Sequence, residues 1–431
     1  MSSDRTIEGR SGQGPLRPVT IALAVLLPFA IGYFLSQMFR SVNAVVGPDL
    51  VHDVGLSAAE LGFLTSAYLL AFALFQLPLG VLLDRYGPRR VQSVLIALAG
   101  GGSLLFAIGE SFLTLTLARA LIGLGFAGGL MSGFKAVVIW VPEDRRALAN
   151  AIVMSFGALG ILVATQPIDL SVQAFGWREV FQGLGVITFA VALLIFFVVP
   201  EKVKPSSNAG GLMAQVAAIG SIIGDAAFWR LAPLLATTAG AHIAIQTLWA
   251  GLWFRDVAGM DREGVASHLM AVAIAFMIGI LLSGAVADWF VRRGAHILSV
   301  MNAFLAVFLL SELLIILDIE SLMLPAWLLF GMTGQVAILA YPWLSSHYGI
   351  ALSGRANTAM NLLIFGTAFG TQYAIGEIID LFPSGIPGEY RPEAYQVGFG
   401  LCLAVQLAAL VWYGLGFRSL RGAPPKDAQA D

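Results

Sequence analysis

Charged residues and cysteine are scarce in this chain. Only 12% of its 431 residues are Asp, Glu, Lys or Arg, whereas soluble domains contain about 25%. This amount of charge cannot cover a water-facing surface. The composition therefore excludes an ordinary soluble protein. The single cysteine, Cys402, excludes an intramolecular disulfide and a cysteine-based metal site. The net charge of −2 argues against a basic nucleic-acid-binding protein.

Long apolar runs take the place of the missing charge, and apolar residues make up 58% of the chain. A helix needs about 20 such residues to cross a hydrocarbon core about 30 Å thick, because backbone amides find no water there. Twelve stretches qualify, near residues 19–46, 58–83, 91–109, 112–140, 148–171, 177–199, 228–252, 266–289, 295–317, 322–345, 356–380 and 395–417. The sequence therefore predicts an all-α membrane protein with twelve transmembrane helices.

The basic residues fall unevenly between these stretches. If the N-terminus is cytoplasmic, 17 of the 24 Lys and Arg residues lie on the cytoplasmic side and four on the other, while Arg40, Arg119 and Lys135 fall inside spans. Cytoplasmic loops accumulate basic residues, so both termini are expected in the cytoplasm. Short loops and the absence of an Asn-x-Ser/Thr acceptor suit a multi-pass protein of a bacterial inner membrane.

An internal repeat divides the chain into two halves. Gly80-Val-Leu-Leu-Asp84 recurs 204 residues later as Gly284-Ala-Val-Ala-Asp288, which is typical of duplicated transporter bundles. The expected parts are a cytoplasmic tail (1–18), a six-helix bundle (19–199), a cytoplasmic linker (200–227), a second, pseudo-symmetric six-helix bundle (228–417) and a cytoplasmic tail (418–431). Within the linker, residues 209–224 are apolar but too short to cross, so they are expected along the membrane surface.

The segment Gly80-Val-Leu-Leu-Asp84-Arg85-Tyr-Gly87-Pro-Arg89-Arg90 resembles the loop between helices two and three of the major facilitator superfamily. Arg119 with the glycines after it, Arg146 at the start of the fifth span, and Gly176-Trp177-Arg178 support this resemblance, which covers essentially the whole chain. It implies a secondary carrier whose two bundles rock about a central site, with no cofactor.

The same motif supplies candidate conformational residues. Gly80 allows close helix approach, and Asp84 is placed to meet a helix N-terminus or a basic loop of the other half. The resemblance implies a latch at the cytoplasmic side; alternatively, the three arginines of the motif serve only to set topology. The expected conformational residues are Gly80, Asp84, Arg85, Gly87, Arg89, Arg90, Arg119, Arg146 and Asp288.

Polar residues inside the spans mark a candidate substrate site. Tyr33, Gln37 and Arg40 recur at i, i+4 and i+7, which places them on one helix face. A cation at mid-span costs about 2.5 to 3.5 kcal/mol on insertion scales, so Arg40 is a site hypothesis, the alternative being that it extends to outer headgroups. The segment also resembles the first helix of organophosphate and related anion carriers, whose second arginine, in helix seven, has only Arg255 near an outer end as its counterpart.

Further polar stripes occur in the second half. His242, Gln246 and Trp249 share one face of helix seven, although His242 could instead bond to a neighbouring helix. Arg119 and Lys135 lie about 160° apart around one helix, so they share a cavity only if that helix bends. The expected substrate-binding residues are Tyr33, Gln37, Arg40, Asn43, Lys135, His242, Gln246, Trp249, Gln335, Asn361 and Gln372.

These residues make the central field cationic, since no carboxylate lies centrally in helices one to six. The expected function is secondary transport of a small organic anion, a carboxylate or phosphorylated metabolite, coupled to protons or a counter-anion. A monomer in the lipid bilayer, with no nucleic acid bound, is expected. Two alternatives remain open: a proton-coupled multidrug or metabolite exporter, and a non-transporting sensor on the same fold. Metalloprotease, nucleophile-elbow and P-loop motifs are absent, so no enzyme is predicted.

Overall fold

The fold is helical throughout the described chain. The computed structural model describes residues 18–201, 212–384 and 388–422, where the strand-like pairing is one isolated bridge between Pro383 and Tyr390. The expected tails and linker therefore lie partly outside the described residues. The first half contains α1 (Pro18–Ile21), α2 (Leu27–Ser41), α3 (Asn43–Val54), α4 (Ala58–Ala107), α5 (Phe112–Phe126), α6 (Gly129–Trp140), α7 (Arg146–Val163), α8 (Gln166–Phe175) and α9 (Trp177–Val198). After α10 (Leu212–Ile223) follow α11 (Ala226–Ala244), α12 (Ala250–Asp256), α13 (Arg262–Val291), α14 (Ile297–Leu317), α15 (Met323–Thr333), α16 (Tyr341–Asp380) and α17 (Pro392–Gly422).

Eleven helical segments of the described ranges are long and apolar enough to cross a membrane. The longest, α4, has 50 residues, and at about 1.5 Å per residue it is more than twice as long as a hydrocarbon core is thick. Gly87 inside it has φ 78° and ψ 161°, a conformation that favours glycine, so the chain leaves helical geometry there. The spans expected at 58–83 and 91–109 both belong to α4, on either side of this kink.

Other expected spans are interrupted. The first one leaves its α-helix at Ser41, and α3 then continues through Pro48 to Val54, although Pro48 was expected to lie beyond the helix. The fourth span breaks between α5 and α6, at Ala127 and Gly128. Broken helices within membrane spans are tolerated where the freed backbone is buried in protein or lines a cavity.

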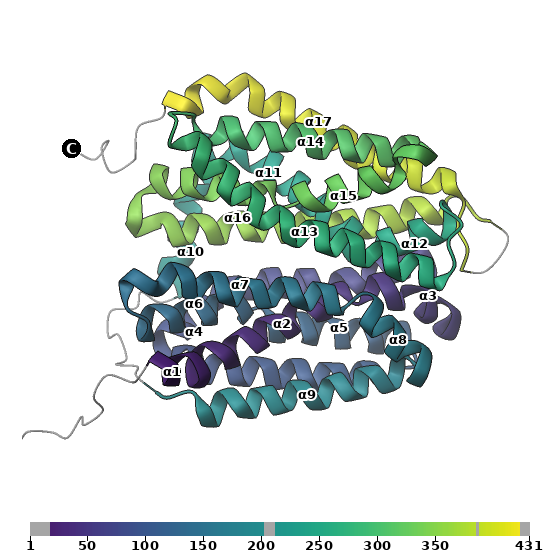
Figure 1. The fold of residues 1–431 in the computed structure, drawn as a ribbon, viewed down its shortest axis with the longest axis horizontal. Helices are drawn as coiled ribbons and strands as arrows, with labels where there is room; N and C mark the ends of the chain where they lie inside the picture. Colours follow the sequence, from purple (N-terminus) through teal and green to yellow (C-terminus); the bar gives the residue numbers. More distant parts are fainter. Residues whose placement is uncertain (1–17, 202–211, 385–387, 423–431) are drawn as a thin grey trace, which may run out of the picture.

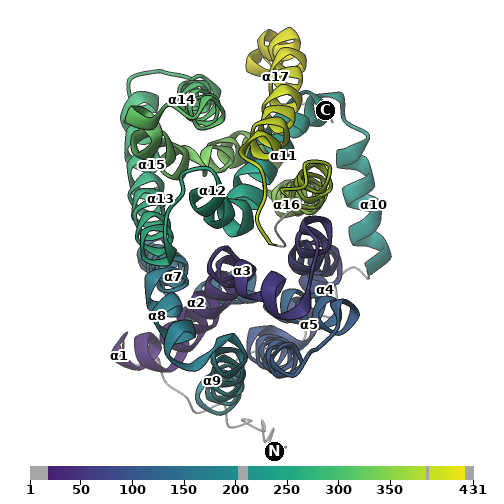
Figure 2. The same cartoon turned by 90° about the vertical axis from the view of Figure 1, so that its right-hand side faces the viewer.

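The helices form two groups (Figures 1 and 2). Helices α1–α9 lie on one side of the molecule and α11–α17 on the other, and α10 packs against α4 and α16. Between the groups, α4 packs against α16, α7 and α8 pack against α13, and α3 packs against α12. Large apolar side chains point outward, such as Phe197 and Leu415, which are 73% and 77% exposed, as expected for a surface that faces lipid.

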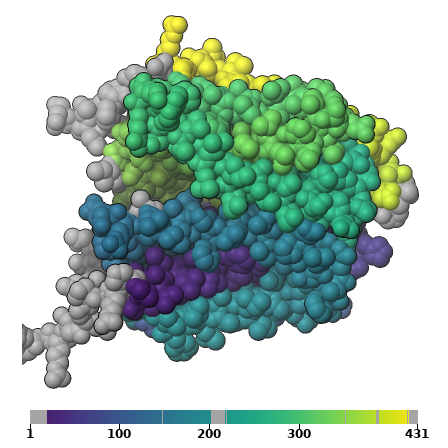
Figure 3. All heavy atoms as spheres, viewed as in Figure 1, coloured from purple at the N-terminus to yellow at the C-terminus, as the bar shows by residue number. Residues whose placement is uncertain are grey.

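The two ends of the molecule differ. Helix α1 and the last turns of α17 lie at the same end, at the left of Figure 1, which we call the terminal end; the opposite one is the distal end. Figure 3 shows the surface hollowed between the two groups toward the terminal end, whereas at the distal end the groups touch.

Close helix approach in the first group depends on glycine. A Cβ atom at Gly123 of α5 would lie 2.2 Å from the carbonyl oxygen of Tyr68 in α4. Small residues allow membrane helices to pack this closely. The contact sets the position of Arg119, which lies one turn earlier on α5.

Replacing Gly123 with alanine is expected to lower the melting temperature of the detergent-purified protein. The added methyl group meets backbone rather than a movable side chain, and overpacking costs about 1–3 kcal/mol. Gly400→Ala in α17 is the matched control, because nothing lies within 4 Å of its Cβ position. Equal melting temperatures for the two variants would contradict the close approach of α4 and α5.

Candidate functional site

A cavity of about 330 Å³ lies between the two helix groups. It is lined by α2, α4 and α7 from the first group and by α11, α13 and α16 from the second. Seven of the eleven expected substrate-binding residues border it, and their role in binding stays a prediction. The polar lining residues are Tyr33, Ser36, Gln37, Arg40, Gln76, His242, Gln246, Thr247, Gln335, Tyr341, Asn357 and Asn361.

The stripe expected on the first helix faces this cavity. Gln37 donates a hydrogen bond from its amide to the Tyr33 hydroxyl at 3.0 Å. Arg40 makes no hydrogen bond or ion pair within the described chain, and its Nε is buried without a partner. Its guanidinium carbon lies 6.0 Å from the centroid of the Phe365 ring, a weak cation–π contact. The guanidinium therefore keeps its hydrogen-bonding capacity for a ligand.

His242 faces the cavity from the second group. Three phenylalanine rings surround its imidazole, with centroids 5.6 Å (Phe276), 6.1 Å (Phe308) and 5.0 Å (Phe330) away. Gly334 makes room for the ring, since a Cβ at that position would lie 1.9 Å from its Nε2. This Nε2 is buried and has no hydrogen-bond partner, so it also offers a polar atom to a ligand.

The charge that borders the cavity is positive. Among the described residues that border the cavity, Arg40 is the fixed charge and none is Asp or Glu. Its amide groups come from Gln37, Gln76 and Gln246 and from other Asn and Gln residues of both groups. Amides and hydroxyls supply hydrogen bonds without charge. The arrangement suits an anion with further polar groups.

Interruptions of helical geometry coincide with the cavity wall. Ala127 lies at the break between α5 and α6, and its carbonyl accepts a hydrogen bond from the Gln76 amide at 3.0 Å. On the other side, Gln246 and Thr247 belong to a π-helical turn, and Gln335 directly precedes a 3-10 turn that leads into α16. Such departures place backbone polar groups beside a cavity rather than beside lipid.

Four expected substrate-binding residues do not border the cavity. The Trp249 indole donates to the backbone oxygen of Gln372 at 3.1 Å, and the Gln372 amide donates to Thr65 at 2.6 Å. The first contact lies within the second group, and the second joins α16 to α4 across the two groups. Asn43 binds Arg119 instead, and Lys135 pairs with Asp84.

Arg119 is fully buried inside the first group. Its guanidinium donates to the carbonyl of Phe39 at 3.2 Å and to the Asn43 side chain. The rings of Phe106 and Phe181 lie 4.5 Å and 5.2 Å from its guanidinium carbon. Backbone, amide and aromatic partners thus surround this charge in place of a carboxylate.

Asp84 corrects an expectation. Its carboxylate accepts a hydrogen bond from the Lys135 ammonium at 2.7 Å, so it meets α6 of its own group rather than the other half. The physical reason is the break at Ala127 and Gly128. After this break, α6 places Lys135 beside the part of α4 that precedes the Gly87 kink. Lys135 and Arg119 do not share a cavity even with this break.

The remaining motif residues stay within one group or at the surface. Arg85 stacks on Tyr86. Arg89 donates to the Phe196 carbonyl at 2.7 Å, and Arg90 pairs with Glu201 at 2.8 Å. Arg146 donates to the carbonyls of Val138 and Val141, and Asp288 pairs with exposed Arg292. Gly80 lies within α4, and Gly87 forms its kink. Their conformational role stays a prediction.

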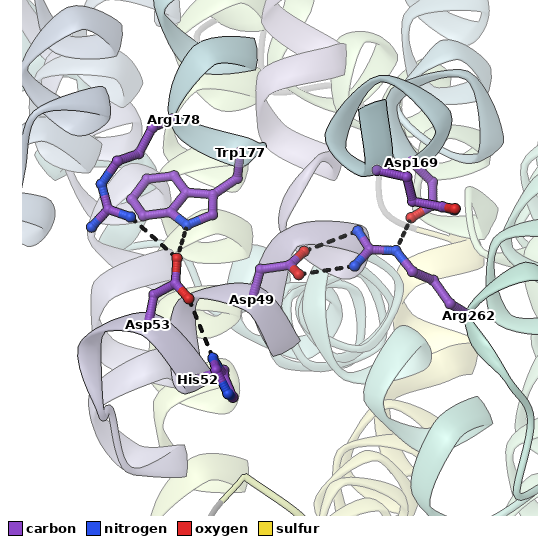
Figure 4. Close-up of polar contacts among 8 residues, drawn as sticks. Asp49, His52, Asp53, Asp169, Trp177, Arg178 and Arg262 are labelled. Carbon is purple, nitrogen blue, oxygen red and sulfur yellow. Dashed lines mark hydrogen bonds and ion pairs between the residues drawn. The ribbon is translucent and has the colours of Figure 1, made fainter. Parts of the chain in front are cut away.

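The distal end holds ion pairs between the two groups (Figure 4). Arg262, at the start of α13, donates two hydrogen bonds to Asp49 of α3, at 2.9 Å and 3.0 Å. The same guanidinium donates to Asp169 of α8 at 2.6 Å. In addition, the Asp380 carboxylate of α16 accepts the backbone N–H groups of Ala58 and Ala59 at 2.9 Å each, which caps α4 from the other group.

A second distal cluster stays within the first group. Asp53 accepts hydrogen bonds from the Trp177 indole at 2.8 Å and from Arg178 at 3.1 Å (Figure 4). The Trp177 hydrogen bond lowers the pKa of the Asp53 carboxyl, and burial offsets part of this effect. Asp49 and Asp53 thus lie one helical turn apart on α3 but bind different groups.

Known proteins identify the family. The sequence model of the Major Facilitator Superfamily matches residues 29–371. The chain belongs to this superfamily. It is a membrane transporter and not an enzyme.

Several relatives of the transporter are named after organic acids. A probable sulfoacetate transporter of Cupriavidus necator is 26% identical over 66% of this chain and 69% of its own length. A hexuronate transporter of Bacillus subtilis is 24% identical over 64% of this chain and 66% of its own. A probable galactarate/D-glucarate transporter of Escherichia coli is 23% identical over 87% of this chain and 89% of its own.

Solved structures show the same fold. A bacterial homologue of the human lysosomal transporter Spinster, in an inward-facing and unoccupied conformation, has a TM-score of 0.74 at 17% identity and covers 95% of this chain and 99% of its own. A D-xylose–proton symporter has a TM-score of 0.69 at 14% identity and covers 91% of this chain and 97% of its own.

Sequence reasoning missed two parts of this transporter. Gln76 borders the cavity from α4, and its presence in an otherwise apolar span was a usable signal. The bridge from Arg262 to Asp49 and Asp169 had no such signal, because each residue lies at a span end where charge is ordinary.

Replacing Asn43 with alanine is expected to lower the melting temperature of the transporter, because Arg119 loses a side-chain partner in a buried site. Hydrogen bonds to charged groups contribute about 1.5–3 kcal/mol. Asn43→Asp is the contrasting variant: a carboxylate there keeps an acceptor and adds an opposite charge, so stability is retained. Equal losses in both variants would show that Arg119 does not depend on this partner.

Proposed function

We propose that this transporter is a secondary carrier that moves a small organic anion across the bacterial inner membrane by alternating access. The observation that carries the proposal is Arg40, a cation without a protein partner in a cavity between the two helix groups. Opposite charge in a low-dielectric site favours an anionic ligand. The names of the organic-acid transporters among its relatives support the same class.

The proposed architecture is twelve spans in two pseudo-symmetric six-helix bundles, 19–199 and 228–417, joined by the cytoplasmic linker. The eleven candidate spans amount to twelve crossings when the two parts of α4, which meet at Gly87, are counted separately. The repeat of Gly80–Asp84 at Gly284–Asp288 supports the symmetry. The bias of basic residues supports a cytoplasmic location for the terminal end and for both chain termini.

In this orientation the carrier is open to the cytoplasm. The hollow between the bundles faces the terminal end (Figure 3), and Arg262 and Asp380 join the bundles at the distal, periplasmic end. Alternating access then requires these distal contacts to separate while the terminal end closes. We propose Asp49, Asp169 and Arg262 as the distal gate of a monomeric carrier.

Arg40→Ala is expected to reduce anion uptake into proteoliposomes at least tenfold, because the cavity loses the charge that holds the substrate. Radiolabelled sulfoacetate, D-glucarate and D-glucuronate are the probes, each first assayed for a rise in melting temperature on binding to the wild type. Arg293→Ala is the control, since this arginine lies at the surface against Trp289. Unchanged uptake by Arg40→Ala would remove Arg40 from the site.

Asp49→Asn is expected to open the distal end more often. Val45, which lies beside Arg262 in a small distal cavity, serves as a reporter in the variant Val45→Cys on a Cys402→Ser background. A membrane-impermeant maleimide is expected to label it about twofold faster or more after Asp49→Asn, because a partly exposed ion pair contributes up to about 1 kcal/mol.

Asp53→Asn is the matched control for this experiment. It removes the same chemical group one turn away on α3, but its partners Trp177 and Arg178 belong to the same bundle. Labelling should stay at the parental rate. If both substitutions accelerate labelling equally, the ion pair of Arg262 does not gate the distal end.

A further inference from the structure

Two tryptophans and an arginine form a cluster on the outer surface of the second group. Trp229 and Arg230 belong to α11, and Trp412 belongs to α17. The two indole side chains are 40% and 44% exposed, so the cluster lies at the surface that faces lipid. It lies toward the terminal end, where α11 begins and the last turns of α17 are found (Figure 1).

The position of Arg230 is set by its neighbours. Its guanidinium carbon lies 4.0 Å from the centroid of the Trp412 ring, which is a close cation–π contact. The Trp412 indole donates to the backbone oxygen of Trp229 at 2.7 Å, which holds the ring against α11. Gly416, one turn further along α17, makes room for the arginine, since a Cβ there would lie 2.6 Å from its Cδ. Packing therefore orients both the ring and the charge stacked on it.

The charge of Arg230 is not neutralised within the described chain, where it makes no hydrogen bond or ion pair. The carboxylate nearest to it in sequence, Asp225, accepts the backbone N–H of Ala227 at 3.0 Å and the hydroxyl of Tyr348 at 2.9 Å. A guanidinium that stacks on a ring keeps the N–H groups in its own plane available. These N–H groups match the oxygens of a phosphate group.

The surroundings of the cluster favour a lipid as the source of this phosphate. Tryptophan side chains gather at the level of the membrane headgroups. From Trp412 toward the middle of the span, α17 exposes Val411 and Leu407, which are 64% and 45% exposed, as a surface for an acyl chain. A headgroup with a net negative charge is favoured over a zwitterionic one, because the charge of Arg230 has no other counter-charge.

We propose that Trp229, Arg230 and Trp412 form a binding site for the phosphate of an anionic phospholipid in the cytoplasmic leaflet. Arg230 binds the phosphate, the two indoles lie at the headgroup level, and an acyl chain follows the apolar face of α17. The bound lipid joins α11 to α17 at the membrane surface. The choice of leaflet rests on the proposed orientation of the carrier, whereas the site does not depend on the transported anion.

Lipid binding is measured as the rise in melting temperature of the detergent-purified full chain on addition of phosphatidylglycerol. Phosphatidylcholine with the same acyl chains is the comparison, and the wild type is expected to respond to phosphatidylglycerol at lower concentrations. Arg230→Ala is expected to raise the concentration for a half-maximal response about fivefold, the effect of one arginine near an anionic headgroup. Arg293→Ala is the matched control, because that arginine also stacks on a tryptophan but donates to the Trp289 carbonyl at 3.4 Å.

Gly416→Ala tests the geometry of the site without changing any charge. The added methyl group occupies the place of the Arg230 Cδ, so the guanidinium has to leave its position on the Trp412 ring. Phosphatidylglycerol binding is therefore expected to weaken in the same direction as in Arg230→Ala. Gly414→Ala is the control on the same helix, since nothing lies within 4 Å of its Cβ position, and it should respond as the wild type does.

The outcomes distinguish a specific site from general attraction. Weaker binding in Arg230→Ala and Gly416→Ala, with wild-type binding in both controls, supports the lipid site. Equal weakening in Arg230→Ala and Arg293→Ala would show a response to overall charge and overturn the site, and an equal response of the wild type to both lipids would overturn an anionic lipid.

Inorganic phosphate tests the source of the phosphate group. A rise in melting temperature with inorganic phosphate that Arg230→Ala abolishes would assign the site to a soluble anion and overturn the lipid. These measurements involve no transport, so the proposed anion transport and the lipid site can fail separately.

Discussion

A positive charge inside an apolar helix assembly needs a partner, and this constraint organises the structure around its embedded cations. Arg119 obtains backbone, amide and aromatic partners inside the first group, and Lys135 obtains the Asp84 carboxylate near the terminal end. Arg40 differs from both. It borders the cavity between the groups and makes no hydrogen bond or ion pair within the described chain.

The backbone is arranged to present this cavity. The break between α5 and α6, the π-helical turn before α12 and the 3-10 turn before α16 all border it. Glycine contributes in the same way, since Gly334 gives the His242 ring its place beside the cavity. A continuous helix would offer only side chains at these points. The interrupted helices add irregular backbone, and the two groups contribute comparable shares of the wall.

The two ends of the molecule hold different kinds of contact. At the distal end, Arg262 and Asp380 reach across the groups, whereas Asp84 at the terminal end binds within its own group. Contacts across an interface favour the conformation in which that interface is closed. The asymmetry therefore accounts for a cavity that is hollowed toward one end. Under the proposed alternating access, the distal ion pairs are the contacts that separate.

The sequence by itself determined the membrane class, the approximate spans and the shared face of Tyr33, Gln37 and Arg40, because apolar length and helical periodicity are local properties. It also located most of the polar residues that border the cavity. Only the tertiary structure decided which charges meet. Arg262 bonds to Asp49 and Asp169, which lie 213 and 93 positions away in the sequence. Lys135 pairs with Asp84 because of the break between α5 and α6. A linear pattern records no distance between helices, so it cannot distinguish the unpaired Arg40 from cations whose partners lie on another helix.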